Sequence, residues 1–186
     1  MRRLLLVRHA PTAATRAFAF PADEALDADG VQAAVALRLS IPTGHEVLCS
    51  PSARCVQTAD AARLAEPLLD ERLAECDFGA WTGRTLDDVC AEDAESVGTW
   101  MRDPAARPHG GESLATFADR VGGWLDEQSR LDGSAVAITH GGVVKAAVVR
   151  ALGAPIEAFW RVDAPPLAVT ELHAHDGRWT VTKVNA

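Results

Sequence analysis

The chain has 186 residues, 48% of them hydrophobic and 24% charged, and a formal net charge of -8. This length favours a single domain over residues 1–186, and the ordinary composition excludes general disorder. The acidic balance argues against nucleic acid as a partner, because nonspecific binding needs a basic surface. Leu4–Val7, the first apolar run, is too short for a membrane span or a signal peptide. We therefore expect a cytoplasmic protein with no membrane partner.

The chain opens with an apolar run that stops abruptly at Arg8 and His9 and is followed by Pro11. Such a run predicts a strand that is buried on both faces and lies centrally in a parallel sheet. Arg8 and His9 would then stand at its carboxyl end. Ligands of open α/β sheets bind at that edge, so the pair is a candidate site.

Two helices and a strand are predicted next. Residues 13–25 form a long irregular segment of the kind that covers a site. Asp27 is expected to cap a helix whose apolar positions (Val31, Ala34, Val35 and Leu39) repeat until Pro42 ends it. A short strand is expected at 46–49. Ser50-Pro51 then begins a helix that runs to about Leu64, which places Arg54 one turn inside it, at the same edge as His9.

The middle of the chain contains a second candidate lid, so that the lid-like segments lie near 13–25 and 76–113. We expect extended chain at 68–73, an ordered loop at 75–83 and a helix at 86–94. The prolines and paired glycines of 100–113 argue against regular helix there. Ser113 then caps a helix that carries Leu114, Phe117, Val121, Trp124 and Leu125.

The last third repeats the opening pattern. A buried strand at 135–139 ends at His140, two glycines follow, and a helix is expected over 143–152. Alternating apolar residues on both sides of Asp176-Gly177 predict a hairpin at a sheet edge.

Together, Arg8, His9, Arg54, Glu75 and His140 have the chemistry of phosphoryl transfer. Two arginines can each give two charge-assisted hydrogen bonds to a phosphate. A neutral imidazole can attack phosphorus, and a protonated carboxyl group can supply the proton that a leaving alkoxide needs. The glycines after His140 allow close backbone approach at a helix N-terminus, where an anion is favoured.

These blocks resemble the histidine phosphatase superfamily, also called phosphoglycerate mutase-like. Leu6–Thr12 is similar to the family's first histidine motif and Ser50–Thr58 to its second arginine block. Leu73–Gly83 is similar to its acid loop and Thr139–Gly142 to its second histidine motif. The resemblance covers nearly the whole chain. It implies an α/β fold, a three-layer α/β/α sandwich with a mostly parallel central sheet and an antiparallel edge.

The resemblance also implies roles. His9 would be the nucleophile that becomes phosphohistidine, Arg8, Arg54 and His140 would hold the phosphoryl oxygens, and Glu75 would protonate the leaving group. Gly141 and Thr15 would contact substrate, although Thr15 stands where the family often has asparagine, and Ala10 replaces a glycine. No metal and no organic cofactor is implied.

Residues 100–113 are similar to a stretch of the family's α-ribazole phosphatase-like branch. The substrate expected on that basis is a small phosphorylated metabolite, such as α-ribazole 5'-phosphate. The chain lacks the extra length of the glycolytic mutases, which favours a phosphatase. A protein phosphohistidine phosphatase, a phosphoglycerate mutase and a non-catalytic phosphate-binding protein are the alternatives.

Some assignments stay open at this point. Asp77 could replace Glu75 as the acid, although the motif position favours Glu75. We expect Arg107 and His109 to be solvated loop residues and Lys145 to extend toward water. Whether any of these three contacts substrate, and the oligomeric state, are left undecided.

Overall fold

The computed structural model of the chain describes residues 1–41 and 43–186. Its centre is a six-stranded sheet in the order β3-β2-β4-β1-β5-β6. The strands are β1 (Arg2–Arg8), β2 (Glu46–Cys49), β3 (Leu68–Leu69), β4 (Gly133–Thr139), β5 (Val169–His175) and β6 (Arg178–Lys183). The first four in that order are parallel, whereas β5 runs antiparallel to β1 and β6 antiparallel to β5. The predicted central position of the opening strand and the hairpin edge are confirmed.

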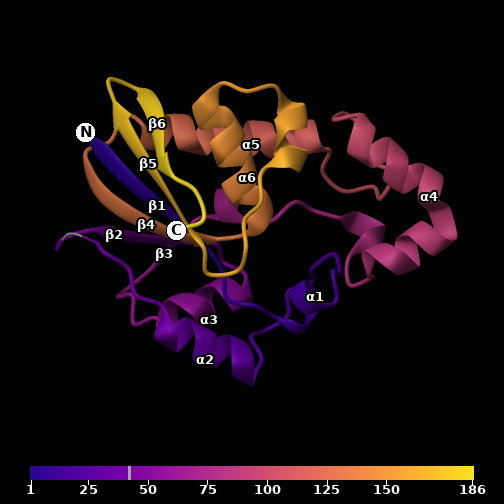
Figure 1. Cartoon of the computed structure of the whole chain (residues 1–186), viewed down its shortest axis with the longest axis horizontal. Coiled ribbons are helices and arrows are strands. Elements are labelled where there is room, and N and C mark those ends of the chain that lie inside the picture. Colours follow the sequence, from indigo (N-terminus) through magenta and orange to yellow (C-terminus); the bar gives the residue numbers. More distant parts are fainter. Residues whose placement is uncertain (42) are drawn as a thin grey trace.

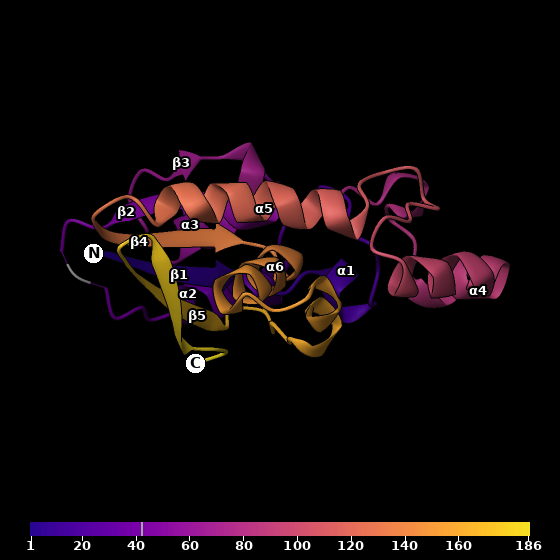
Figure 2. The same ribbon diagram turned by 90° about the horizontal axis from the view of Figure 1, so that it is seen from above.

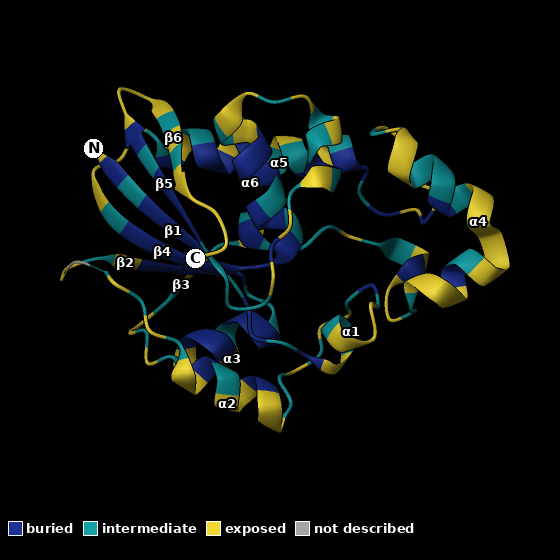
Figure 3. Ribbon diagram, in the orientation of Figure 1, coloured by how far each residue is buried: buried dark blue, intermediate teal, exposed yellow. Residues whose placement is uncertain are grey.

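Helices cover both faces of this sheet (Figure 1). The alternation of side chains along β1 sends Leu4 and Leu6 to one face, under α5 (Leu114–Gln128) and α6 (Gly141–Leu152). Leu5 and Val7 point to the other face, under α3 (Ala53–Ala61). Helix α2 (Ala28–Ala36) lies beside α3. The expected three-layer α/β/α sandwich is therefore the observed fold, and its central strands are the most completely buried (Figure 3).

The boundaries of the first helices differ from the prediction. Helix α2 is capped by Asp27 but ends at Ala36, because Leu37 turns extended and packs, with Leu39, under the sheet. Pro42, the expected end of this helix, lies outside the described residues. Within α2 the buried side is formed by Gly30 and Ala34, whereas Val31 and Val35 are exposed, against expectation.

Three further boundaries were predicted wrongly. Helix α3 begins after Ser52 and ends at Ala61, short of Leu64. The expected extended stretch 68–73 is strand only at Leu68–Leu69, because the Asp70 side chain caps a 3-10 turn at Glu71–Leu73. Helix α6 begins at Gly141 rather than 143.

The segment between β3 and α5 projects from one end of the sheet (Figure 2). Helix α4 (Leu86–Arg102) is longer than predicted and is kinked at Asp93, whose carboxylate accepts a hydrogen bond from the Ser96 amide and so starts a second helical stretch. It therefore includes the first residues of the expected loop 100–113.

An aromatic cluster joins the two segments that we expected to act as lids. Phe20 follows the short helix α1 (Ala13–Arg16) of the irregular segment 13–25 and packs against Phe78, Trp81 and Trp100. His109 belongs to the same cluster and is only 2% exposed, so our expectation of a solvated residue was wrong. Its ring stacks edge-on against Trp81 and accepts a hydrogen bond from the Gly111 amide, which is why this histidine is buried. Arg107 is exposed.

Within the described residues, no helix combines the length and the apolar character needed to cross a membrane.

Candidate active site

Three segments that are far apart in the sequence meet at the carboxyl end of the parallel strands. His9 follows β1, Arg54 lies in the first turn of α3 after β2, and His140 caps α6 directly after β4. These side chains meet because β1 and β2 both flank β4 in parallel. Arg54 donates from Nε to His9 Nε2 at 3.2 Å and from Nη2 to His140 Nδ1 at 3.2 Å.

The two imidazole rings are buried and held by hydrogen bonds on their other nitrogens. His9 Nδ1 lies 2.7 Å from the Ala10 carbonyl oxygen, so it carries the proton and leaves the lone pair on Nε2. His140 accepts from Arg54 at Nδ1 and therefore donates from Nε2 to the Ser50 hydroxyl at 2.9 Å. The ring centroids of the two histidines are 5.2 Å apart.

Burial and neighbouring cations keep both rings neutral. Burial lowers the pKa of His9 to about 3, and the charges of Arg54 and Arg8 act in the same direction. The pKa of His140 is lowered well below its usual value by the same causes. A neutral imidazole keeps a lone pair, which on His9 Nε2 accepts the hydrogen bond from Arg54. A nitrogen in this state can attack an electrophile without first losing a proton.

Arg8 and Glu75 complete the group. Arg8 donates from Nη1 to the Ala164 carbonyl oxygen at 2.7 Å, and its buried Nε has no hydrogen-bond partner among the described residues. Glu75 accepts from the Gly142 amide at 3.1 Å. The start of α6 is closely packed against both side chains: a Cβ at Gly142 would lie 2.1 Å from Glu75 Oε1 and would displace that carboxylate, and one at Gly141 would lie 3.3 Å from the Arg8 guanidinium.

Of the two acidic residues left open by the sequence, Glu75 is the one beside the cavities. Glu75 lines the two cavities of the site, which are described below, whereas the Asp77 carboxylate accepts a hydrogen bond from the Gly79 amide within its own loop. Thr15 lines one of these cavities, but its hydroxyl takes part in the N-terminal cap of α1. It donates to the Thr12 carbonyl and accepts from the Thr12 amide, each at 2.8 Å.

Two cavities lie beside the cluster of side chains around His9 and Glu75. One of about 220 Å³ lies along α6 and the other, of about 310 Å³, lies under the segment that contains Phe18 and Phe20. Both are lined by Arg8, Glu75, Phe78, Trp100 and Trp160. Trp100 and Trp160 pack edge-to-face with their ring centroids 4.9 Å apart and form part of the wall of both cavities.

Sequence reasoning did not assign roles to several residues that position this group. Ser50 holds His140, and Thr58 accepts a hydrogen bond from the Ala10 amide while it donates to the Arg54 carbonyl. Both lie in the Ser50–Thr58 block, so their motif position was the available signal. Glu24 lies 3.6 Å from Arg54 Nη1, and nothing in its irregular surroundings pointed to that contact.

Among residues 1–41 and 43–186, no three or more His, Cys, Asp or Glu side chains are grouped so that they could hold a metal ion.

The model of one protein family, the histidine phosphatase superfamily (branch 1), matches residues 4–186. Phosphoserine phosphatase 1 of Hydrogenobacter thermophilus is 27% identical, over 100% of this chain and 92% of that protein. The adenosylcobalamin/α-ribazole phosphatase of Escherichia coli is 32% identical, over 87% of this chain and 85% of that protein. The crystal structure of the α-ribazole phosphatase from Shigella flexneri is similar with a TM-score of 0.85 and 26% identity, over 99% of this chain and 96% of that one.

Proposed function

The chain belongs to branch 1 of the histidine phosphatase superfamily, and on that premise we propose that it hydrolyses a small phosphate monoester through a phosphohistidine formed on His9. It is a phosphoric monoester hydrolase, as its family and its phosphatase relatives establish. The identity of the nucleophile, the roles of the other side chains and the substrate are the proposal.

One observation carries the proposal: a neutral, buried imidazole presents Nε2 to the guanidinium of Arg54, beside a second neutral imidazole. A phosphoryl group at this point meets a lone pair on one side and fixed cationic donors on the other. Preorganised donors of this kind stabilise the charge of the transition state. Arg8 and Arg54 supply the positive charge that metal ions supply in kinases, so the reaction needs no metal ion.

In the first step His9 Nε2 forms a bond to phosphorus while the bond from phosphorus to the ester oxygen breaks. Protonated Glu75 transfers its proton to that oxygen, and the alcohol leaves. In the second step the Glu75 carboxylate takes a proton from water, whose oxygen bonds to phosphorus as the bond to His9 breaks. Inorganic phosphate and neutral His9 result, and Glu75 is protonated again.

The segments 13–25 and 76–113 are proposed to act as covers of this site. Each contributes wall to the cavity under Phe18 and Phe20, and the aromatic cluster of Phe20, Phe78, Trp81 and Trp100 joins them. A cover made of two segments that pack on each other can exclude water from the reacting phosphoryl group.

A small phosphorylated metabolite in the cytoplasm is the proposed substrate. The similarity of residues 100–113 to the α-ribazole phosphatase-like branch supports α-ribazole 5'-phosphate, and the relative named phosphoserine phosphatase supports a smaller ester. A panel of phosphorylated metabolites that includes both compounds distinguishes them.

The test of the mechanism is hydrolysis of p-nitrophenyl phosphate by the wild type, His9→Ala and His175→Ala. His175 is an exposed histidine at the β5–β6 turn and serves as the matched control. We expect His9→Ala to lose activity, His175→Ala to keep it, and EDTA to leave the wild type unaffected. Activity that survives in His9→Ala, or that EDTA abolishes, would contradict the proposal.

A further inference from the structure

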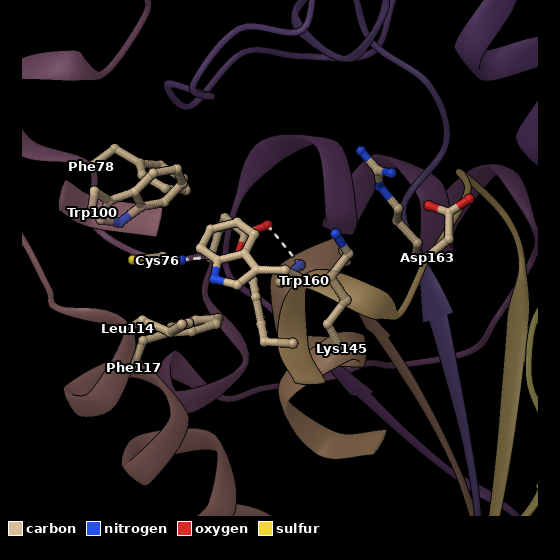
Figure 4. A pocket seen from close by; sticks show the side chains of 13 residues that line it. Cys76, Phe78, Trp100, Leu114, Phe117, Lys145, Trp160 and Asp163 are labelled. Atoms are coloured by element: carbon tan, nitrogen blue, oxygen red, sulfur yellow. Dashed lines mark hydrogen bonds between the residues drawn. The ribbon is translucent and has the colours of Figure 1, made fainter. Parts of the chain in front are cut away.

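The cavity of about 220 Å³ beside Glu75 is placed to receive the alcohol part of the substrate. This reading rests on the proposed function, in which Glu75 protonates the ester oxygen and that oxygen therefore faces Glu75. Gly141, Gly142 and Lys145 of α6 line the cavity. Figure 4 shows the Lys145 side chain, which projects from this helix, among the residues that line the cavity. Aromatic and aliphatic side chains enclose the remainder: Phe78, Trp100, Leu114, Phe117, Phe159 and Trp160.

Lys145 brings a positive charge into this mostly apolar cavity. It lies one turn after Gly141 and Gly142, so its side chain leaves α6 on the face that also holds Glu75. The ammonium lies over the Phe159 ring, 5.5 Å from the centroid, and the side chain is half-buried. Phe159 thus orients the ammonium toward the cavity. We had expected the Lys145 side chain to extend to water and had not predicted that it lines the cavity.

The two nearest carboxylates do not pair with this ammonium. Among the residues that the structure describes, Lys145 forms no ion pair within 4.0 Å, and its Nζ takes part in no hydrogen bond. Asp163 accepts a hydrogen bond from the Ala164 amide, and Glu75 accepts from Gly142. Burial lowers the pKa of Lys145, and Asp163 and Glu75 raise it, so the unpaired charge is only partly compensated.

We propose that Lys145 is a specificity-determining residue that binds a carboxylate on the alcohol part of the substrate, so that the preferred substrates are phosphate monoesters of hydroxy acids. A half-buried ammonium without an ionic partner gains most from an anion that the ligand supplies. A carboxylate suits this place better than a second phosphate, because Asp163 also lines the cavity and would repel a dianion more strongly than a single negative charge. The aromatic walls limit the alcohol to a compact one.

The chain contains only two lysines, Lys145 and Lys183, which provides a matched control. Lys183 lies on the edge strand β6 with 61% of its side chain exposed and pairs with Glu171 at 3.5 Å. The variants are Lys145→Met, Lys145→Glu and Lys183→Met. The substrates are a matched pair, 3-phosphoglycerate and glycerol 3-phosphate, which differ in that only the first carries a carboxylate.

The measured quantity is the ratio of kcat/KM for 3-phosphoglycerate to that for glycerol 3-phosphate. A charge-assisted contact that one substrate lacks predicts a ratio of about tenfold to a hundredfold in the wild type and in Lys183→Met. The ratio should fall at least about fivefold in Lys145→Met and below one in Lys145→Glu, where the introduced carboxylate repels the acid. If turnover of either compound is too slow to measure, the ratio of their inhibition constants against p-nitrophenyl phosphate hydrolysis replaces it.

A wild-type ratio near one, or a ratio that Lys145→Met leaves unchanged, would overturn the inference. That result leaves the proposed function standing as long as p-nitrophenyl phosphate hydrolysis depends on His9. Conversely, hydrolysis that persists in His9→Ala would overturn the proposed mechanism, whichever ester is preferred.

Discussion

The chemistry of His9 follows from its burial more than from its neighbours. The side chain is 3% exposed, and loss of hydration is the largest cause of its lowered pKa. The carbonyl of Ala10 opposes the shift by binding the Nδ1 proton. The ring therefore keeps its Nε2 lone pair over the whole physiological pH range, and the positive charges that act on it are those of Arg54 and Arg8.

The same burial makes the protein less stable in acid. The unfolded chain binds a proton at His9 below a pKa of about 6.5, whereas the folded protein does so only near pH 3. Stability is therefore lost as the pH falls from about 6.5 toward 3. We predict that His9→Gln reduces the loss of unfolding free energy between pH 7 and pH 5 by about 2 kcal/mol, measured by urea unfolding.

His140 is buried in the same way, so part of the acid sensitivity should remain in His9→Gln. His175→Gln is the control, because that side chain is exposed and should leave the pH dependence unchanged. An equal loss of stability in the wild type and in His9→Gln would show that His9 does not fold in its neutral form.

The effect of removing the Glu75 carboxyl group on the reaction rate should be larger for leaving groups that depart only after they are protonated. For an alkyl phosphate, Glu75→Gln is expected to lower the rate constant for phosphorylation of His9 by about 10²- to 10⁴-fold, and for p-nitrophenyl phosphate by less than about tenfold, because nitrophenolate leaves unprotonated. This first step is measured in a single turnover, because the second step, in which Glu75 takes a proton from water, is the same for both substrates. Asp77→Asn is the comparison, since Asp77 was the alternative acid and binds Gly79 instead. If Asp77→Asn shows the leaving-group dependence and Glu75→Gln does not, the assignment is wrong.

At the scale of elements, the start of α6 holds Glu75, the proposed acid, in place. The Gly142 amide binds Glu75, and a Cβ at Gly142 would meet chiefly the Glu75 carboxylate, the movable end of a side chain, with the Phe117 ring next at 3.1 Å. Gly142→Ala should thus displace Glu75 without disrupting the backbone. We predict a loss of kcat of at least about tenfold with an unfolding free energy within about 1 kcal/mol of the wild type.

Gly123→Ala is the matched control for this substitution. Gly123 lies in α5, and a Cβ there would meet no atom within 4 Å. The variant should keep full activity and gain about 0.5–1 kcal/mol of stability from helix propensity. Full activity in Gly142→Ala would mean that the position of Glu75 does not limit the reaction.

The elements that the sequence predicted well are those whose pattern is local. The strand before His9 and the Ser113 cap before α5 are fixed by apolar runs and capping side chains. The kink at Asp93 escaped prediction because it arises where one carboxylate caps a new helical turn within an otherwise continuous helix. His109 escaped it because its burial depends on Trp81 and Trp100, which reach it through tertiary packing alone.

Across the whole molecule, the sheet explains why the grouping of His9, Arg54 and His140 could be predicted. The carboxyl ends of parallel strands share one edge, so residues that end β1 and β4 had to meet, and Arg54 joins them at the start of α3. The cavity of about 220 Å³ beside Glu75, which we propose receives the alcohol part of the substrate, could not be predicted in this way. Its wall combines α6 with Phe159, Trp160 and Asp163 from the connection to β5, and no short-range pattern brings these side chains together.

The covalent step on His9 is the central claim, and rapid-quench trapping with a phosphate ester carrying ³²P tests it most directly. We predict a protein-bound phosphoryl group that is acid-labile and base-stable, that forms before phosphate is released, and that maps to the peptide containing His9. His9→Ala should form none. Turnover without a phosphorylated protein, or a label on any other residue, would contradict the account.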